Sequence, residues 1–353
     1  EMLRRITHFM EEHPDLFIHL GLDEQCIFDL EGELRRIEKY ERYIKLLHRI
    51  RKDQPRAYAI AHGFFDKSII ADLIVNGRRV EVPAYFDLFK KEPDAHPDEL
   101  SEIVNILNAT NCDAALFDLV RAVAAPVYES PRVVGGEFAL DWLIFEAFLL
   151  AFDPRDASDQ GVQMVLDRLE GMELPVNLNA DSIAGDIRDT LGEFPDASDV
   201  NFGSKKERTP FYVKVMRHFT AWLHEHELLS WPSARHFASK VGDYLVETAT
   251  GKKGSHQFQF HYDRTDRYVA ENCKLMFWID GVRALSLLQG VWWFAAYLNQ
   301  QEVFDASEVD RVRAASVKLA DLVNKAVDVS DDGPRIFPDL AHYRWAAPPV
   351  TVG

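Results

Sequence analysis

The sequence predicts an all-α protein: a multi-helix domain built around one central buried helix near 264–298, with one small β-hairpin near 70–82. Apolar residues recur at three- and four-residue spacing along most of the chain, which is the period of an amphipathic helix. Near 264–298 they cover nearly every helical face, as in a helix buried on all sides. The alternation of strands and helices found in α/β proteins is absent, as are nucleotide-binding glycine motifs.

Length and composition are those of a folded globular protein. The 353 residues, 47% of them hydrophobic, suffice for one large domain or two ordinary ones. A loop rich in proline and glycine follows the first third of the chain, and proline and aromatic residues concentrate at its end. We therefore predict an N-terminal helical lobe over 1–127, a C-terminal helical lobe with a pocket over 128–330, and an extended tail over 331–353 packed on the body.

In the N-terminal lobe, residues 33–52 form an amphipathic pattern that ends in cations before Pro55, as expected of a helix. The hairpin prediction rests on Asn76-Gly77, which stands between two runs of β-prone residues. A capping pattern at Thr110 then begins a short apolar helix that is expected to run to Pro126.

In the C-terminal lobe, a helix over 206–230 and the long apolar helix near 264–298 are expected to line the pocket, since both carry many aromatic side chains. A further capping pattern at Ser307 begins the last predicted helix.

His226 lies on the same face of the 206–230 helix as Trp222, so the helical period predicts that it points inward. An inward histidine among aromatic rings can bind haem iron axially, which makes His226 the candidate metal ligand and Trp222 a candidate cofactor contact. The alternative is a hydrogen-bonded core histidine. His224 points the other way, so the two histidines cannot hold one metal ion.

The segment 256–268, "HQFQFHYDRTDRY", concentrates histidines, aromatics and charges before the central helix. His261 is a candidate proton-transfer residue, and Arg264 a candidate partner for an anionic group such as a haem propionate. Asp280 and Arg283, three residues apart inside the apolar stretch, form either a structural ion pair or a charged pair that binds a polar ligand. Asp280 is accordingly a second catalytic candidate and Arg283 a second anion-binding one.

Several other kinds of site are disfavoured. The three cysteines stand far apart without metal-ligand spacing, and no serine nucleophile elbow or His-Glu-x-x-His zinc motif occurs. Glu137, Asp141 and Glu146 lie in one apolar helix, but the Glu-x-x-His partners of a dinuclear iron site are missing.

The sequence thus favours a soluble small-molecule-binding protein or enzyme with an aromatic-lined helical pocket, with haem-dependent oxidative chemistry as one possibility. The alternative is a non-catalytic helical interaction protein, such as an inhibitor, immunity or scaffold factor, whose acidic surface binds a basic partner. The net charge of −17 argues against nucleic-acid binding. The lack of an uninterrupted apolar run, at the start of the sequence or elsewhere, predicts a cytoplasmic protein without a membrane span.

Overall fold

The computed structural model describes most of the helical body of the protein. The described residues are 5, 8, 9, 12–19, 30, 34, 40–129, 160, 163, 164, 166, 167, 185, 193–227, 229–250, 257–275 and 278–329. The predicted tail over 331–353 and the carboxylates Glu137, Asp141 and Glu146 lie outside them.

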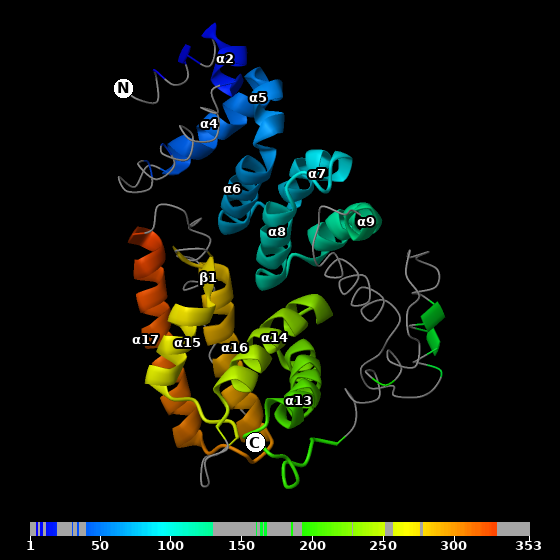
Figure 1. The fold of residues 1–353 in the computed structure, drawn as a ribbon, viewed down its shortest axis with the longest axis vertical. Helices are drawn as coiled ribbons and strands as arrows, with labels where there is room; N and C mark the ends of the chain where they lie inside the picture. The colour runs from blue at the N-terminus through cyan, green and yellow to red at the C-terminus, as the bar shows by residue number, and fades with distance from the viewer. Residues whose placement is uncertain are drawn as a thin grey trace.

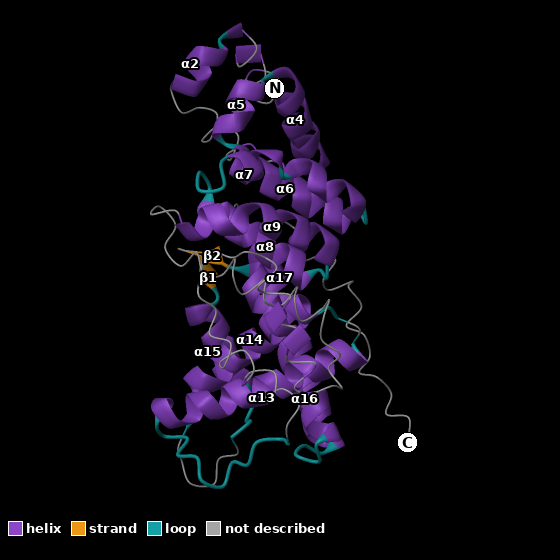
Figure 2. Ribbon diagram, turned by 90° about the vertical axis from the view of Figure 1, so that its right-hand side faces the viewer, coloured by secondary structure: helices purple, strands orange, loops and turns teal. Residues whose placement is uncertain are grey.

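The prediction of a mainly helical protein is confirmed (Figure 2). The N-terminal helices are α2 (Pro14–His19), α4 (Tyr40–Asp53), α5 (Pro55–Ile60), α6 (His62–Val75), the 3₁₀ helix η1 (Arg79–Tyr85), α7 (Asp87–Lys91), α8 (Pro97–Ala109) and α9 (Asp113–Glu129). The C-terminal elements are α13 (Lys205–His226), α14 (Trp231–Thr248), α15 (Tyr262–Asn272), strands β1 (Lys274–Leu275) and β2 (Trp278–Ile279), α16 (Gly281–Gln300) and α17 (Ala306–Val329).

Helix α16 lies at the centre of the C-terminal helices. It packs against α13, α14 and α17, and it also contacts α8, which in turn contacts α14 (Figure 1). Its side chains are buried on most faces, including Leu288, Trp292 and Phe294. The expectation of a central buried helix is therefore met by α16. The division into lobes at 127/128 stays a prediction, because α9 continues to Glu129 and the chain beyond it is not described.

The central helix is shorter than predicted. The stretch 264–298 is divided into α15, the two-residue antiparallel strands β1 and β2, and α16. The division occurs where the Asp280 amide donates to the Cys273 carbonyl (2.9 Å) and the Asp280 carboxylate accepts from the Arg283 amide (2.9 Å), which begins a new helix. Hydrophobicity on every face is shared by buried helices and buried hairpins, so the sequence pattern alone did not reveal this break.

The predicted hairpin near 70–82 is wrong. Helix α6 ends at Val75, and the Asn-Gly pair follows it and caps its C-terminus. Gly77 has φ +71°, its amide donates to the Ile74 carbonyl (3.0 Å), and the Arg78 amide donates to Leu73 (2.7 Å). These two bonds are those of a Schellman motif, which needs a left-handed residue just as an Asn-Gly hairpin turn does.

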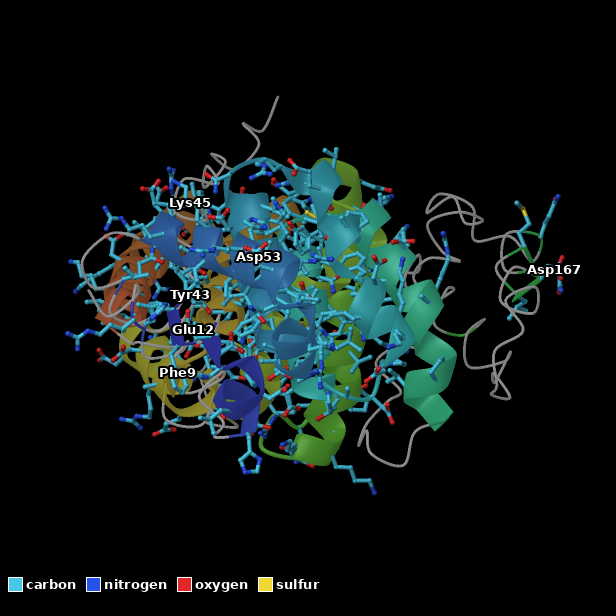
Figure 3. The ribbon with its side chains drawn as sticks, turned by 90° about the horizontal axis from the view of Figure 1, so that it is seen from above. Phe9, Glu12, Tyr43, Lys45, Asp53 and Asp167 are labelled. Atoms are coloured by element: carbon cyan, nitrogen blue, oxygen red, sulfur yellow. The ribbon has the colours of Figure 1, made fainter. Side chains whose placement is uncertain are left out.

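The predicted helix over 33–52 corresponds to α4, which is described from Tyr40. Its two faces differ as the period predicts: the Tyr43 side chain is fully buried, whereas Lys45 is exposed. Figure 3 labels both residues, together with Asp53 at the end of the helix. The apolar face of α4 therefore joins the core that also holds α6.

Two predicted helix boundaries differ by a few residues. Helix α9 continues through Pro126 to Glu129, three residues beyond the predicted end. Helix α17 is capped by Asp305 and not by Ser307: the Asp305 carboxylate accepts from the Glu308 amide at 2.9 Å. Asp is as good a cap as Ser, so either residue fits the pattern.

Candidate functional site

His226 does not lie inside the protein. It is the last residue of α13, and its side chain is exposed. It does share a face with Trp222, since the two rings stack with centroids 5.0 Å apart, and its Nδ1 lies 3.1 Å from the Trp222 carbonyl oxygen. The predicted inward orientation is therefore wrong, because the helix ends where the neighbouring helices no longer cover that face.

Trp222 itself is buried and has a structural role. Its indole N–H donates to the Gln300 side-chain oxygen (2.5 Å), which joins α13 to the end of α16. Its ring packs with Phe219 and Tyr297, and Phe294 contacts these two in turn. These aromatic side chains fill the space between α13 and α16 by packing against one another, as side chains of a core do.

His261 and Arg264 are placed at the start of α15. The His261 side chain is exposed, and its Nε2 lies 3.0 Å from the Gln259 side-chain oxygen. The Arg264 guanidinium donates to the Thr248 carbonyl (3.0 Å) and so ties α15 to the end of α14. The functional roles predicted for His261 and Arg264 stay predictions, and neither residue lines the groove described next.

Arg283 is the predicted site residue that does line a large concave surface. This surface, here called the α13–α14 groove, has a volume of about 510 Å³, within the range of small-molecule sites. It follows the seam between α13 and α14 and is bordered by α15 and α16. Its lining residues are Lys205, Thr209, Tyr212, Val213, Met216, Arg235, Ser239, Gly242, Asp243, Val246, Glu247, Tyr268, Asn272 and Arg283.

Asp280 and Arg283 do not form the predicted charged pair. The Asp280 carboxylate caps α16 by accepting from the Arg283 backbone amide, and the described residues place no carboxylate within 4 Å of the Arg283 guanidinium. Arg283 lines the groove instead. Asp280 therefore has a structural role, whereas Arg283 forms part of the groove surface.

Lys240 stands next to Arg283. Burial is the main cause that lowers the pKa of the Lys240 ammonium, and the positive charge of Arg283 adds to it. Within the described ranges, Lys240 makes no hydrogen bond and no ion pair shorter than 4 Å. Two carboxylates act in the opposite direction and raise the pKa of Lys240: Asp243, which is exposed at the groove, and Asp280, which caps α16.

Sequence analysis missed Lys240 and Asp243. The available signal is the face of α14 that carries Arg235, Ser239, Gly242 and Asp243 at helical spacing. Small and charged residues on one face of an otherwise apolar helix indicate a side that neighbouring helices leave open. Its partner surface on α13 could not be inferred, because the two faces are brought together only by the tertiary fold.

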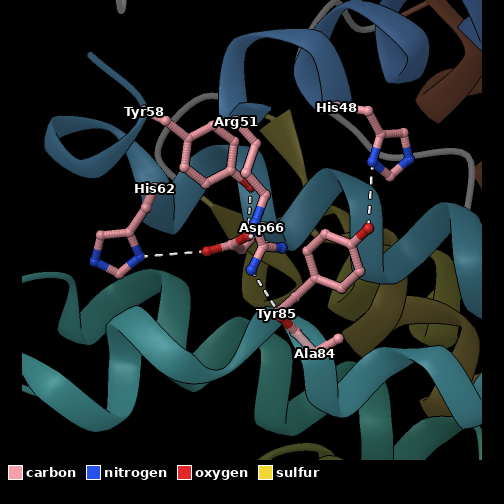
Figure 4. Close-up of polar contacts among 7 residues, drawn as sticks. All are labelled: His48, Arg51, Tyr58, His62, Asp66, Ala84 and Tyr85. Carbon is pink, nitrogen blue, oxygen red and sulfur yellow. Dashed lines mark hydrogen bonds and ion pairs between the residues drawn. The ribbon is translucent and has the colours of Figure 1, made fainter. Parts of the chain in front are cut away.

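A second cluster of ionisable groups lies among α4, α5 and α6 (Figure 4). Its centre is the buried Asp66 carboxylate, which accepts a hydrogen bond from the Tyr58 hydroxyl and has the Arg51 guanidinium 3.7 Å away. The Arg51 guanidinium also donates to the Ala84 carbonyl (2.7 Å) and lies over the Tyr85 ring, 4.2 Å from its centroid.

His62 lies on the other side of Asp66. Its Nδ1 is 3.5 Å from the carboxylate, and its ring packs edge-on against Phe89 and His96. Both His62 and Asp66 are almost completely buried, at 2% and 1% exposure. A closed cluster of this kind, with a tyrosine and an arginine around one carboxylate, holds helices together, and it is not open to a ligand.

Neither cluster is a metal centre: no group of three or more potential ligands with suitable geometry occurs within the described ranges. In the same part of the chain, every helix is too short or too polar to cross a membrane. Comparison with protein-family models, curated proteins and solved structures finds no match to this chain.

Proposed function

We propose that this protein binds a small organic molecule in the α13–α14 groove. The observation that carries the proposal is the groove itself, where four helices bring apolar and charged side chains around one volume of about 510 Å³. Apolar side chains with a few convergent polar groups are the usual composition of a small-molecule site.

The proposal concerns binding and not catalysis. The Lys205–Glu247 ion pair holds one of the two carboxylates that line the groove. No nucleophile and base lie within hydrogen-bond distance of each other among the lining residues: the Thr209, Tyr212 and Ser239 hydroxyls each donate to a backbone carbonyl.

A ligand screen with a blocked variant tests the proposal. We expect ligand-observed NMR against a fragment library to detect compounds that bind the native protein and fail to bind Ser239→Trp, whose indole would fill the groove. The control is Ala270→Trp, which adds the same ring at an exposed position of α15. Circular dichroism and the unfolding temperature establish that both variants fold. The proposal would be contradicted if every compound that binds the native protein also bound Ser239→Trp and Ala270→Trp equally well.

The alternative function, a helical interaction protein for a basic partner, is favoured by the net charge of −17. Binding of a polylysine peptide, measured at 50 and 500 mM NaCl, tests it. This function requires binding that weakens steeply with salt and that is unchanged in Ser239→Trp.

A further inference from the structure

The α13–α14 groove carries an excess of positive charge in an acidic protein. Three cations and two carboxylates line it, and the Lys240 ammonium interacts electrostatically with one of these cations, Arg283, whereas the chain as a whole has a net charge of −17. Such a local reversal of sign attracts anions into the groove.

The carboxylates around Arg283 either interact with other groups or lie too far away to form an ion pair with it. Glu247 forms an ion pair with Lys205, and Asp280 accepts the first amide bond of α16. Asp243 is exposed and lies beyond 4 Å from any described cation. Arg283 therefore retains hydrogen-bond donors at the groove that no described side chain uses. An acidic group of a ligand could accept from them and would also be attracted by the positive charge of Lys240, which interacts with Arg283.

The neutral hydroxyl groups of the groove offer few donors. The Thr209 and Ser239 hydroxyls donate to carbonyls of their own helices, and the Tyr212 hydroxyl donates to the Gln257 carbonyl. The Tyr268 hydroxyl has no described partner, and burial raises its pKa to about 12, so it keeps its proton at neutral pH and can donate. A ligand recognised mainly through uncharged hydroxyl groups, such as a sugar, would find little to bind.

Part of the groove is apolar. Val213 is 37% exposed there, beside Met216, Tyr212 and Val246. Covering such side chains with an apolar ligand removes hydrocarbon from water, which favours binding. The groove therefore combines an apolar surface with a pair of cations.

On the basis of the proposed binding function, we infer that the ligand is an amphipathic organic anion. Its acidic group lies at Arg283 and Lys240, where Tyr268 can add a hydrogen bond. Its apolar body lies over Val213 and Met216. Carboxylates and phosphates share this chemistry, and both carry acceptor oxygens that a guanidinium binds in pairs.

Three probes separate the contributions: octanoate, octanamide and acetate, each titrated by calorimetry into the full-length protein. Octanoate and octanamide have the same apolar chain, and acetate has the charge without the chain. We expect octanoate to bind at least tenfold more tightly than either of the others. Inorganic phosphate, used as a competitor, then tells whether the cations prefer a phosphate group.

Two variants assign the contacts. Arg283→Gln is expected to weaken octanoate binding at least tenfold and to leave octanamide unchanged, whereas Val213→Asn weakens both. Arg267→Gln, which removes an exposed arginine of α15, is the control and leaves both unchanged.

The outcomes distinguish this inference from the proposed function. Equal binding of octanamide and octanoate, or screen compounds that are neutral yet blocked by Ser239→Trp, would overturn the inference and leave the binding function in place. Failure of every probe and of every screen compound to depend on the groove would overturn both.

Discussion

The hydroxyl of Tyr58 donates a hydrogen bond of 2.5 Å to a carboxylate oxygen of Asp66, and both side chains are buried. Burial first, and then the negative charge of Asp66, raise the pKa of Tyr58, so its hydroxyl remains protonated and acts as donor. The bond connects α5 to α6, and Arg51 brings α4 to the same carboxylate. One buried charge thus joins three helices.

Tyr58→Phe is therefore expected to lower the free energy of unfolding by about 1–3 kcal/mol, because it removes a donor from a buried charged acceptor. Urea denaturation monitored by circular dichroism measures the effect. Tyr85→Phe is the control: it removes a hydroxyl that lies 3.2 Å from a ring nitrogen of the part-buried His48, and its loss is expected to be smaller. A loss for Tyr85→Phe as large as that for Tyr58→Phe would argue against a special role for Asp66.

His236 is expected to make the protein less stable in mild acid. Its Nε2 lies 2.9 Å from the Ser286 hydroxyl oxygen, and burial, aided by Lys240, lowers its pKa to about 3. A lowered pKa means that the unfolded chain binds the proton more readily, so stability is full above pH 6.5 and is lost as the pH falls toward 3. The loss from pH 6.5 to 5 is expected to be about 2 kcal/mol.

His236→Gln tests this expectation, since its amide can still bond to Ser286 but does not titrate. Its free energy of unfolding is expected to vary less between pH 6.5 and 5 than that of the native protein. If the free energy of unfolding changed equally with pH in both proteins, the stability loss in acid would not come from His236.

Glu227 is expected to have the opposite effect. It follows the last turn of α13, one of its carboxyl oxygens is buried without a hydrogen-bond partner, and burial raises its pKa to about 7. The folded state thus holds this proton more tightly, so the stabilising contribution is full below about pH 4.5 and is lost as the pH rises through 7.

Glu227→Gln is therefore expected to stabilise the protein at pH 8 by about 1–3 kcal/mol, because burial disfavours the ionised carboxylate and the amide that replaces it carries no charge. At pH 4.5 it is expected to be nearly neutral. Unfolding temperatures at both pH values measure the difference, and Glu225→Gln, which changes an exposed neighbour, is the control. Equal effects of the two substitutions would contradict the burial argument.

The sequence predicted which segments are helical better than where helices end. The hydrophobic period of α4 and α13 follows from local residues, and it was confirmed. The Asn76-Gly77 pair and the apolar stretch around Asp280 were misassigned for a shared reason: each local pattern fits two backbone structures, and tertiary packing selects between them.

The candidate site was predicted only in part, for a related reason. Helical spacing correctly placed His226 on the face of Trp222, but exposure depends on how far the neighbouring helices extend, which no local pattern contains. Arg283 was found because a charge stands out in an apolar stretch. Lys240 was missed because its environment is formed by α16, far along the chain.

The exposure of His226 has a direct consequence. His226→Ala is expected to change the free energy of unfolding by less than about 0.5 kcal/mol, as is usual for surface positions. Trp222→Ala removes a buried ring and its bond to Gln300, and is expected to cost about 3–5 kcal/mol. Chemical denaturation of both variants measures this contrast. A loss of several kcal/mol for His226→Ala would restore the inward orientation that the sequence predicted.

The close approach of α14 and α16 depends on Gly290. A Cβ atom there would lie 2.8 Å from a Val241 methyl carbon and 3.0 Å from the Phe237 carbonyl oxygen. Alanine favours a helix over glycine by about 1 kcal/mol, but the Phe237 carbonyl belongs to the backbone of α14 and cannot move without it. Gly290→Ala is thus expected to lower stability by about 1–3 kcal/mol, as overpacking does.

Gly242→Ala is the matched comparison, because its Cβ would meet only the flexible Met216 side chain, 2.9 Å away, and its cost should be below about 1 kcal/mol. Equal unfolding temperatures for the two variants would contradict this expectation. They would mean that α14 can move away from α16 at little cost, and that the contact between these helices does not hold Arg283 in place at the groove.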